Sequence, residues 1–224
     1  MDQLCLIAVE EFIHAGLPVE KAAALLIEVV GPSAGVAADV ERICQLASER
    51  GVGAIRVAAD DAERALLWKG RKSAFGAIAN IMPNYYLHDT VVPRHKLAGV
   101  LDQVYEIVRR HNLQVLNVFH AGDGNLHPLI LFDGSVEGVF ERVHAAGREI
   151  VKASVNAGGV LSGEHGIGLE KRDLMPLMFT ETDLSAQADL RRAFDPQLIS
   201  NPDKVLPNPA TCGEIHSALE GAWI

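Results

Sequence analysis

Residues 115–131, VLNVFHAGDGNLHPLIL, decide the fold of the central part of the chain. Two apolar runs flank the pair Asp123-Gly124, and an Asp-Gly pair in that setting predicts a β-hairpin with a type I′ turn. In this register His120 lies directly opposite His127, with Cβ atoms about 5 Å apart on one face of the sheet. Two imidazoles at that separation can bind one divalent metal ion. The alternative is that one histidine packs in the core and the other ends a strand.

A second glycine-rich segment, SGEHGIG at residues 162–168, adds a carboxylate and another imidazole. Its glycines disfavour a regular helix and allow the backbone to come close to a ligand. Glu164 can complete a His-His-carboxylate metal set, which leaves His165 as a free base beside the metal. The alternative is a loop that binds nothing.

The composition is that of an ordinary globular protein. The chain has 224 residues, is 49% hydrophobic and carries a formal net charge of −9, which argues against a disordered chain and against a nucleic-acid-binding surface. Cys5, Cys44 and Cys212 are odd in number and widely spaced, so reduced thiols and a cytoplasmic location are expected. We find neither a signal peptide nor an apolar run near the roughly 20 residues that span a bilayer.

Helical periodicity, capping residues and β-rich runs predict the remaining elements. The expected helices cover residues 2–15, 36–50, 60–74, 94–111, 135–157 and 183–194. The expected strands cover residues 23–30, 54–58 and 85–92, besides the hairpin. Asp2 and Ser135 are the expected N-caps of two of the helices. His88 and Asp89 are neighbours in a strand, so they should point to opposite faces, and we take both as structural.

This order of elements predicts an α+β fold. The expected architecture is a ferredoxin-like split βαβ sheet with helices on one face, followed by a C-terminal helical tail and an extended finish at residues 207–209. We find no internal repeat and no clear linker, so residues 1–224 are expected to form a single domain.

Four motifs in a fixed order carry a family resemblance. They are WKGRKSAF at 68–75, FHAGDGNLHP at 119–128, SGEHGIG at 162–168 and FDPQLISNPDKVLP at 194–207. Together they resemble the C-terminal domain of FAD-linked oxidases of the vanillyl-alcohol-oxidase superfamily. The resemblance is closest to the branch with the FAD subunit of glycolate oxidase and the D-lactate and D-2-hydroxyglutarate dehydrogenases. It implies a substrate domain that caps the flavin, with the N-terminal FAD-binding domain of the family absent from this chain.

The resemblance also implies a role for each of seven residues. These are the metal ligands His120, His127 and Glu164, the base His165, the substrate ligand Arg71, and the flavin contacts Asn201 and Lys204. The metal would be zinc, iron or manganese. One departure from the family pattern is Asp203, where the flavin-contact segment usually has glycine. Another is the apolar Leu129, which favours a small monocarboxylate over 2-hydroxyglutarate.

The implied function is oxidation of a 2-hydroxy acid of the glycolate or D-lactate type to the 2-oxo acid, with hydride transfer to FAD. The implied partners are this substrate and a FAD-binding domain or subunit. An electron-transfer subunit could also bind, and a bare flavin-contact surface could lead the chain to form a homodimer. Two alternatives stay open: a metal-dependent hydrolase in which the same His-His-Glu set activates water, and a non-catalytic ferredoxin-like binding module. Flavin dependence would separate the oxidase from the hydrolase.

Overall fold

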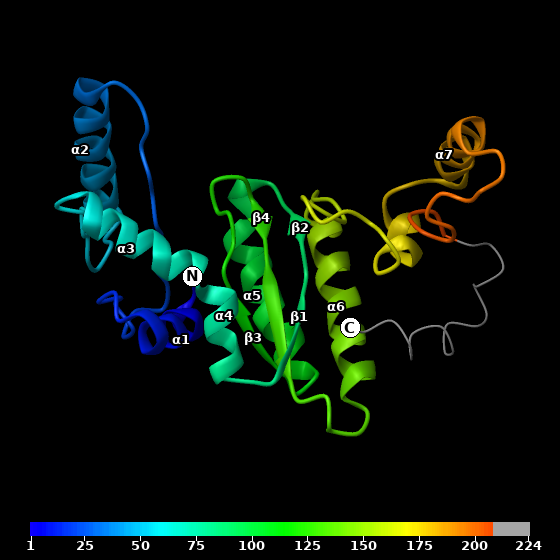
Figure 1. Ribbon diagram of the computed structural model, residues 1–224, viewed down its shortest axis with the longest axis horizontal. Coiled ribbons are helices and arrows are strands. Elements are labelled where there is room, and N and C mark those ends of the chain that lie inside the picture. The colour runs from blue at the N-terminus through cyan, green and yellow to red at the C-terminus, as the bar shows by residue number, and fades with distance from the viewer. Residues whose placement is uncertain (208–224) are drawn as a thin grey trace. The chain divides into compact units, whose positions relative to one another are not determined.

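The computed structural model describes residues 1–207 and combines helices with antiparallel sheet, so the fold is α+β (Figure 1). The chain divides into two compact units, Met1–Ile81 and a second that begins at Met82, and each is described by itself. None of the described helices has the length and apolar content that crossing a bilayer requires. Cys212 and the part of the expected extended finish beyond Pro207 lie outside the described residues.

The first unit is helical. Its elements are α1 (Gln3–Ile13), α2 (Ser33–Glu49), α3 (Asp61–Lys72), α4 (Ala74–Ala77) and the 3-10 turn η1 (Ile78–Asn80). Asp2 and Asp60 cap α1 and α3 by accepting hydrogen bonds from backbone N–H groups of the first turn, as the sequence predicts for Asp2. Leu6 and Val9 of α1 are buried, and α1 packs against α3 and α4. The three helices expected in this part of the chain are therefore confirmed.

The two strands expected in the first unit do not form. Ala23 makes a single bridge to Asp2, and residues 24–30 and 54–58 have no strand pairing. Leu25 and Val30 in the first of these segments are exposed. A β-rich run becomes a strand only when adjacent backbone takes up its hydrogen bonds, and the described part of this unit provides no such neighbour. The prediction of strands at residues 23–30 and 54–58, on either side of the helix, is therefore wrong.

The second unit contains the sheets. Its elements are β1 (Asn84–Leu87), β2 (Thr90–Val91), η2 (Arg94–Lys96), α5 (Leu97–Arg110), β3 (Gln114–Asn117), β4 (Asn125–Leu126), β5 (Pro128–Phe132), α6 (Val139–Asn156), η3 (Arg172–Leu177) and α7 (Glu181–Phe194). The strands β1, β5 and β3 form an antiparallel sheet in that order, and β2 pairs with β4. An antiparallel bridge between Val91 and Val160 adds a further segment beside β2.

The core of the second unit lies where α5 and α6 pack against the sheet (Figure 1). Tyr86, Ile130 and Val115 stand side by side on one face, because the register pairs Tyr86 with Ile130 and Ile130 with Val115. They join one cluster with the buried apolar residues of the two helices, which are Val100, Val104, Ile107, Val108, Val139, Val143, Ala146 and Ile150. The apolar stripe that helical spacing predicts for α5 is thus the one that is buried.

Two helix starts differ from the sequence prediction. The N-cap of α6 is Gly138, with φ of 71°, and the Ser135 hydroxyl instead donates a hydrogen bond to the Asp133 carboxylate. The N-cap of α7 is Thr180, which forms a capping box with Asp183. Ser135 does not start a helix, since its side chain is already engaged by the local turn at Asp133.

Candidate functional site

The hairpin that carries the two histidines has a longer loop than the sequence predicts. β3 pairs with β5, and beyond them the backbones of His120 and Asn125 exchange hydrogen bonds of 3.1 and 3.2 Å. Residues 121–124 form the turn, so His120 lies opposite Asn125 rather than His127. The predicted two-residue type I′ register is therefore wrong. One cause is that Gly124 accepts a hydrogen bond from the backbone of Val92, which ties the turn to β2 instead of leaving it free.

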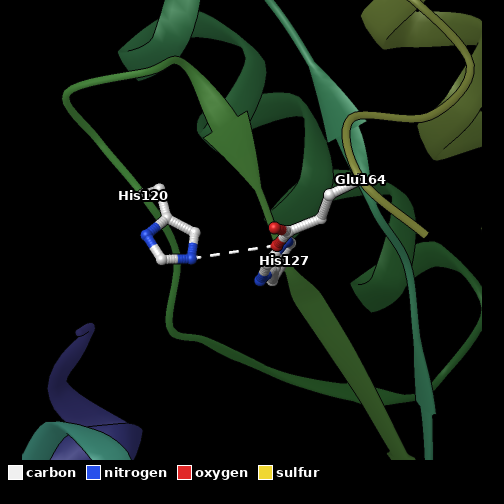
Figure 2. A group of neighbouring side chains, drawn as sticks. All are labelled: His120, His127 and Glu164. Atoms are coloured by element: carbon white, nitrogen blue, oxygen red, sulfur yellow. Dashed lines mark ion pairs between the residues drawn. The ribbon is translucent and has the colours of Figure 1, made fainter.

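The longer loop still brings the two imidazoles together. The ring centroids of His120 and His127 are 5.4 Å apart. Glu164 reaches them from the segment after α6, with its Oε1 atom 3.2 Å from His127 Nε2 and 3.8 Å from His120 Nε2 (Figure 2). One ligand atom from each of these three residues lies within 4.8 Å of the others. We call His120, His127 and Glu164 the triad.

The segment that carries Glu164 is held by a buried carboxylate that the sequence analysis took as structural. Asp89 Oδ2 accepts hydrogen bonds from the Ser162 hydroxyl at 2.7 Å and from three successive backbone N–H groups, those of Gly163, Glu164 and His165, each at 2.9 Å. The other oxygen, Oδ1, is 3.6 Å from His127 Nε2. Asp89 therefore contacts both the loop and one of the two histidines.

A buried lysine balances the charge of this carboxylate. Lys171 Nζ donates a hydrogen bond of 2.5 Å to the Asp89 carbonyl oxygen and lies 3.9 Å from its Oδ2 atom. Burial by itself raises the pKa of Asp89, but the nearby His127 imidazole and the hydrogen bonds from Ser162 and from the loop backbone outweigh it and hold this pKa well below its ordinary value. Asp89 is therefore an anion at neutral pH, although its side chain is fully buried.

The donor atoms of the triad fit a divalent cation. His127 Nε2 and Asp89 Oδ1 are buried and have no hydrogen-bond partner among the described residues. Buried polar atoms without partners are costly and usually mark an ion or a water. Two imidazoles and a carboxylate suit zinc, iron or manganese. The expected set of ligand types is therefore present at one place, with buried acceptor atoms directed toward it.

His165 lies beside the triad. Its ring centroid is 5.2 Å from that of His127, and its side chain belongs to an exposed residue. The backbone N–H of His165 donates to Asp89, so the same carboxylate orients His165 and Glu164. An exposed imidazole next to two metal-type ligands can exchange protons with solvent and with a molecule bound at the triad.

His88 points away from this site, as the alternation of a strand predicts. Its ring packs edge-on against Tyr86, with centroids 4.4 Å apart, and a Cβ atom at Gly147 of α6 would lie 2.1 Å from its Nε2 atom. Burial, then the positive charge of Lys171, lower the pKa of His88 to about 3. His88 is thus a neutral residue of the core, and strand pairing is interrupted between β1 and β2 at His88 and Asp89.

Arg71 belongs to the first unit. It lies in the last turn of α3, and burial lowers the pKa of its guanidinium. Arg71 is therefore partly enclosed rather than part of a fully solvated helix face. Arg71 and the triad belong to different units, each of which is described by itself.

Asn201 and Lys204 lie in a tightly bonded turn after α7. Lys204 Nζ donates to Asn201 Oδ1 at 3.2 Å, and Arg191 donates to the backbone carbonyl oxygens of both residues. Between them Asp203 has φ of 59°, a left-handed conformation that glycine adopts at least cost and that aspartate tolerates better than most residues. Asp203 thus has a backbone conformation that a glycine at this position could also adopt.

Comparison with known proteins decides the family. Residues 1–205 match the family described as FAD linked oxidases, C-terminal domain. The chain belongs to this family. The resemblance carried by the four motifs is thereby confirmed.

The relatives of this FAD-linked oxidase domain are longer than the chain. It is 44% identical over 214 residues to glycolate oxidase subunit GlcD of Escherichia coli (strain K12), covering 96% of the chain and 43% of the relative. It is 33% identical to glycolate oxidase subunit GlcD of Bacillus subtilis (strain 168), covering 94% of the chain and 45% of the relative. It is 30% identical to the mitochondrial D-lactate dehydrogenase [cytochrome] of Kluyveromyces lactis, covering 74% of the chain and 29% of the relative. The chain thus spans less than half the length of these relatives.

A solved structure supports the fold of the FAD-linked oxidase domain. The 4-ethylphenol oxidase from Gulosibacter chungangensis, in its isoeugenol complex, aligns with a TM-score of 0.56 over 79% of this chain and 37% of that one. The sequence identity is 18%, so this likeness bears on the fold alone.

Sequence reasoning missed Asp89 and Lys171 as residues of the site. The alternation of the strand correctly separates Asp89 from His88, but it does not say what lies on the face toward which Asp89 points. A signal was present: Asp89 is the one acidic residue in the expected strand 85–92, and an acid at such a position requires a partner once it is buried.

Proposed function

We propose that this chain is the substrate- and metal-binding part of an FAD-dependent 2-hydroxy acid dehydrogenase or oxidase, of the glycolate or D-lactate type. The observation that carries the proposal is the triad with His165 beside it, within a domain of the FAD-linked oxidase family. The names of the relatives, glycolate oxidase subunit and D-lactate dehydrogenase, support the same substrate class.

The reaction removes a proton from the hydroxyl group and a hydride from the adjacent carbon of a 2-hydroxy acid. FAD would supply the hydride acceptor, and a divalent cation at the triad would supply a positive charge that favours the deprotonated hydroxyl. His165 would take the hydroxyl proton, because an imidazole can act as a general base and this one is open to solvent. It would then release the proton to water.

Orientation of the substrate would come from Arg71. A guanidinium forms two parallel hydrogen bonds to a carboxylate, which fixes the position of the neighbouring hydroxyl and carbon. Lysine would do this less well because it lacks the planar pair of donors. Leu129 is an apolar residue of β5. At a position that would be polar in a dicarboxylate-specific relative, it would favour a small monocarboxylate as substrate. Asn201 and Lys204 would lie toward the flavin.

Several finer parts of the proposal concern architecture and partners. Along the chain, the second unit runs β1 and β2, α5, β3, β4 and β5, α6, and then the segment at Val160. In space, this segment bridges to β2, β2 pairs with β4, and β5 lies between β1 and β3. This order supports a ferredoxin-like split βαβ arrangement. We further propose that FAD is held mainly by a separate FAD-binding domain or subunit. A single cap domain, a cytoplasmic location, a homodimer and an electron-transfer partner remain predictions.

Metal content tests the proposal. The purified chain is loaded with Zn²⁺, Fe²⁺ or Mn²⁺, desalted and assayed by elemental analysis, beside the variants His120→Ala and Glu164→Ala. The matched controls are His95→Ala and Glu137→Ala, which remove exposed residues of the same types outside the triad. We expect close to one metal per wild-type and control chain and none in the triad variants. Equal metal in all five proteins would contradict the proposal, and flavin-independent ester hydrolysis by the loaded chain would favour a hydrolase instead.

A further inference from the structure

We infer that Asp89 is the positioning residue of the site. Its buried carboxylate holds residues 162–165 in the conformation that presents Glu164 and His165 to the two histidines. The inference deepens the proposed function and rests on it for the metal, but its structural part concerns the chain alone.

The first argument is the geometry around Asp89 Oδ2. Three successive backbone N–H groups, from Gly163 to His165, converge on this one oxygen, together with the Ser162 hydroxyl. Successive N–H groups that point to one place form a concave site for an anion. Here the anion belongs to the protein, so the conformation of the loop is set by a side chain of another segment, 75 residues away from Glu164 in sequence.

The second argument is how closely the loop fits. A Cβ atom added at Gly163 would lie 2.8 Å from Asp89 Oδ1 and 2.9 Å from Asn125 Cγ. Glycine is therefore required for the loop to come this close to Asp89 and to β4. The Ser162 hydroxyl also accepts a hydrogen bond of 2.9 Å from the backbone of Gly166, so the loop folds around the carboxylate on both sides of Glu164.

The third argument is that Asp89 is itself fixed. Its side chain is fully buried, and its backbone carbonyl oxygen accepts a hydrogen bond from Lys171 Nζ. Glu164 and His165, by contrast, are exposed residues. Exposed side chains keep a defined position only when their backbone is held. Removing a residue that orients metal ligands in this way usually weakens metal affinity about 10- to 100-fold.

The test compares two variants that act on the contact from opposite sides. Asp89→Ala removes the acceptor, and Gly163→Ala pushes the loop away from it. Asp89→Asn keeps one acceptor oxygen at the same place. Gly122→Ala is the matched control, because a Cβ atom at this glycine of the neighbouring loop meets nothing within 4 Å. All are made in the full 224-residue chain, and circular dichroism verifies that each is folded.

The first measurement is amide hydrogen exchange of residues 163–165 in the metal-free proteins. We expect exchange to be at least about tenfold faster in Asp89→Ala and Gly163→Ala than in the wild type, intermediate in Asp89→Asn, and unchanged in Gly122→Ala. Unchanged exchange in the folded variants overturns the inference. If Asp89→Ala does not fold, Gly163→Ala decides alone, because its side chain is added at an exposed residue.

The second measurement is the affinity for Zn²⁺ alone. We expect it to be about 10- to 100-fold weaker in Asp89→Ala and Gly163→Ala and unchanged in Gly122→Ala. Wild-type affinity in folded variants with fast exchange overturns the link between Asp89 and the metal ligands. If the wild type binds no Zn²⁺, the proposed metal site fails, while hydrogen exchange still decides whether Asp89 positions the loop.

Discussion

The rings of His120 and His127 meet at right angles with centroids 5.4 Å apart, yet the side chain of His120 is 51% exposed and that of His127 only 4%. Both approach the same oxygen of Glu164. His127 is thus part of the packed interior, and His120 lies at the surface. Loss of either histidine removes a metal ligand, but only the loss of His127 also disturbs the packing of the metal-free chain.

Replacing either histidine by alanine should abolish stoichiometric metal binding, but only one change should destabilise the metal-free protein. We expect His120→Ala to change the free energy of unfolding by no more than about 0.5 kcal/mol, since it removes a surface side chain. His127→Ala should lower it by about 1 to 3 kcal/mol, because it empties a packed position. Urea unfolding in the presence of a chelator measures both. Equal losses of stability would contradict this difference between the two positions.

The protonation of His88 should make stability depend on pH. Its pKa in the folded chain is about 3, against the ordinary 6.5. Between these values the unfolded chain binds a proton that the folded chain does not. The free energy of unfolding should therefore fall as pH falls from 6.5 toward 3, by about 1.4 kcal/mol per pH unit from this residue.

Urea unfolding at a series of pH values, with the variant His88→Leu, measures this contribution. Neither ring nitrogen of His88 has a hydrogen-bond partner in the described part of the chain, so an apolar side chain of similar volume loses no bond. We expect the variant to have a shallower slope between pH 4 and pH 6 than the wild type. His95→Leu, at an exposed position, should leave the slope unchanged. Parallel slopes for His88→Leu and the wild type would refute the assignment.

Two glycines in neighbouring helices should respond oppositely to alanine. A Cβ atom at Gly147 of α6 would lie 2.1 Å from His88 Nε2, whereas one at Gly99 of α5 meets nothing within 4 Å. Gly147→Ala should lower the free energy of unfolding by about 1 to 3 kcal/mol through overpacking. Gly99→Ala should raise it by as much as about 1 kcal/mol through helix propensity. Thermal unfolding monitored by circular dichroism compares them, and stabilisation by both substitutions would be inconsistent with the packing of His88.

Replacing isoleucines from two β-rich segments by alanine should lower the free energy of unfolding by different amounts. Ile130 of β5 is fully buried, and Ile27 is 52% exposed. Ile130→Ala should lower the free energy of unfolding by about 2 to 5 kcal/mol, and Ile27→Ala by no more than about 0.5 kcal/mol. Chemical unfolding gives both values. A large loss at Ile27 would contradict the exposure of this side chain.

Local sequence patterns predicted much of this fold. The stripe of Val100, Val104 and Ile107 marks the buried face of α5, and the cap at Asp2 marks the start of α1. The strands expected at residues 23–30 and 54–58 fail because strand propensity says nothing about whether a partner is available. The same limit applies to the hairpin, where the tie between Gly124 and Val92 comes from a segment that precedes it by a whole helix.

The triad shows that a correct neighbourhood can follow from an incorrect register. The observed partner of His120 is Asn125, two residues before His127. Because side chains alternate with a period of two, this shift keeps both imidazoles on the same face. Glu164 could be proposed because a carboxylate in a glycine-rich loop complements two histidines. The contacts of Asp89 with Ser162 and His165 could not be predicted in this way, because they are long-range and leave no periodic pattern in the sequence.

The contact between Asp89 and Glu164 spans 75 residues of chain, and a cation at the triad would join Glu164 to a second segment of the chain, the one that carries His120 and His127. It would act as a removable crosslink that exists only in the folded chain. A ligand that binds only the folded state adds about 2.7 kcal/mol of stability when its free concentration is 100 times its Kd. Loss of the metal would then lower the free energy of unfolding of the chain and raise the fraction of open chains that a protease can cleave.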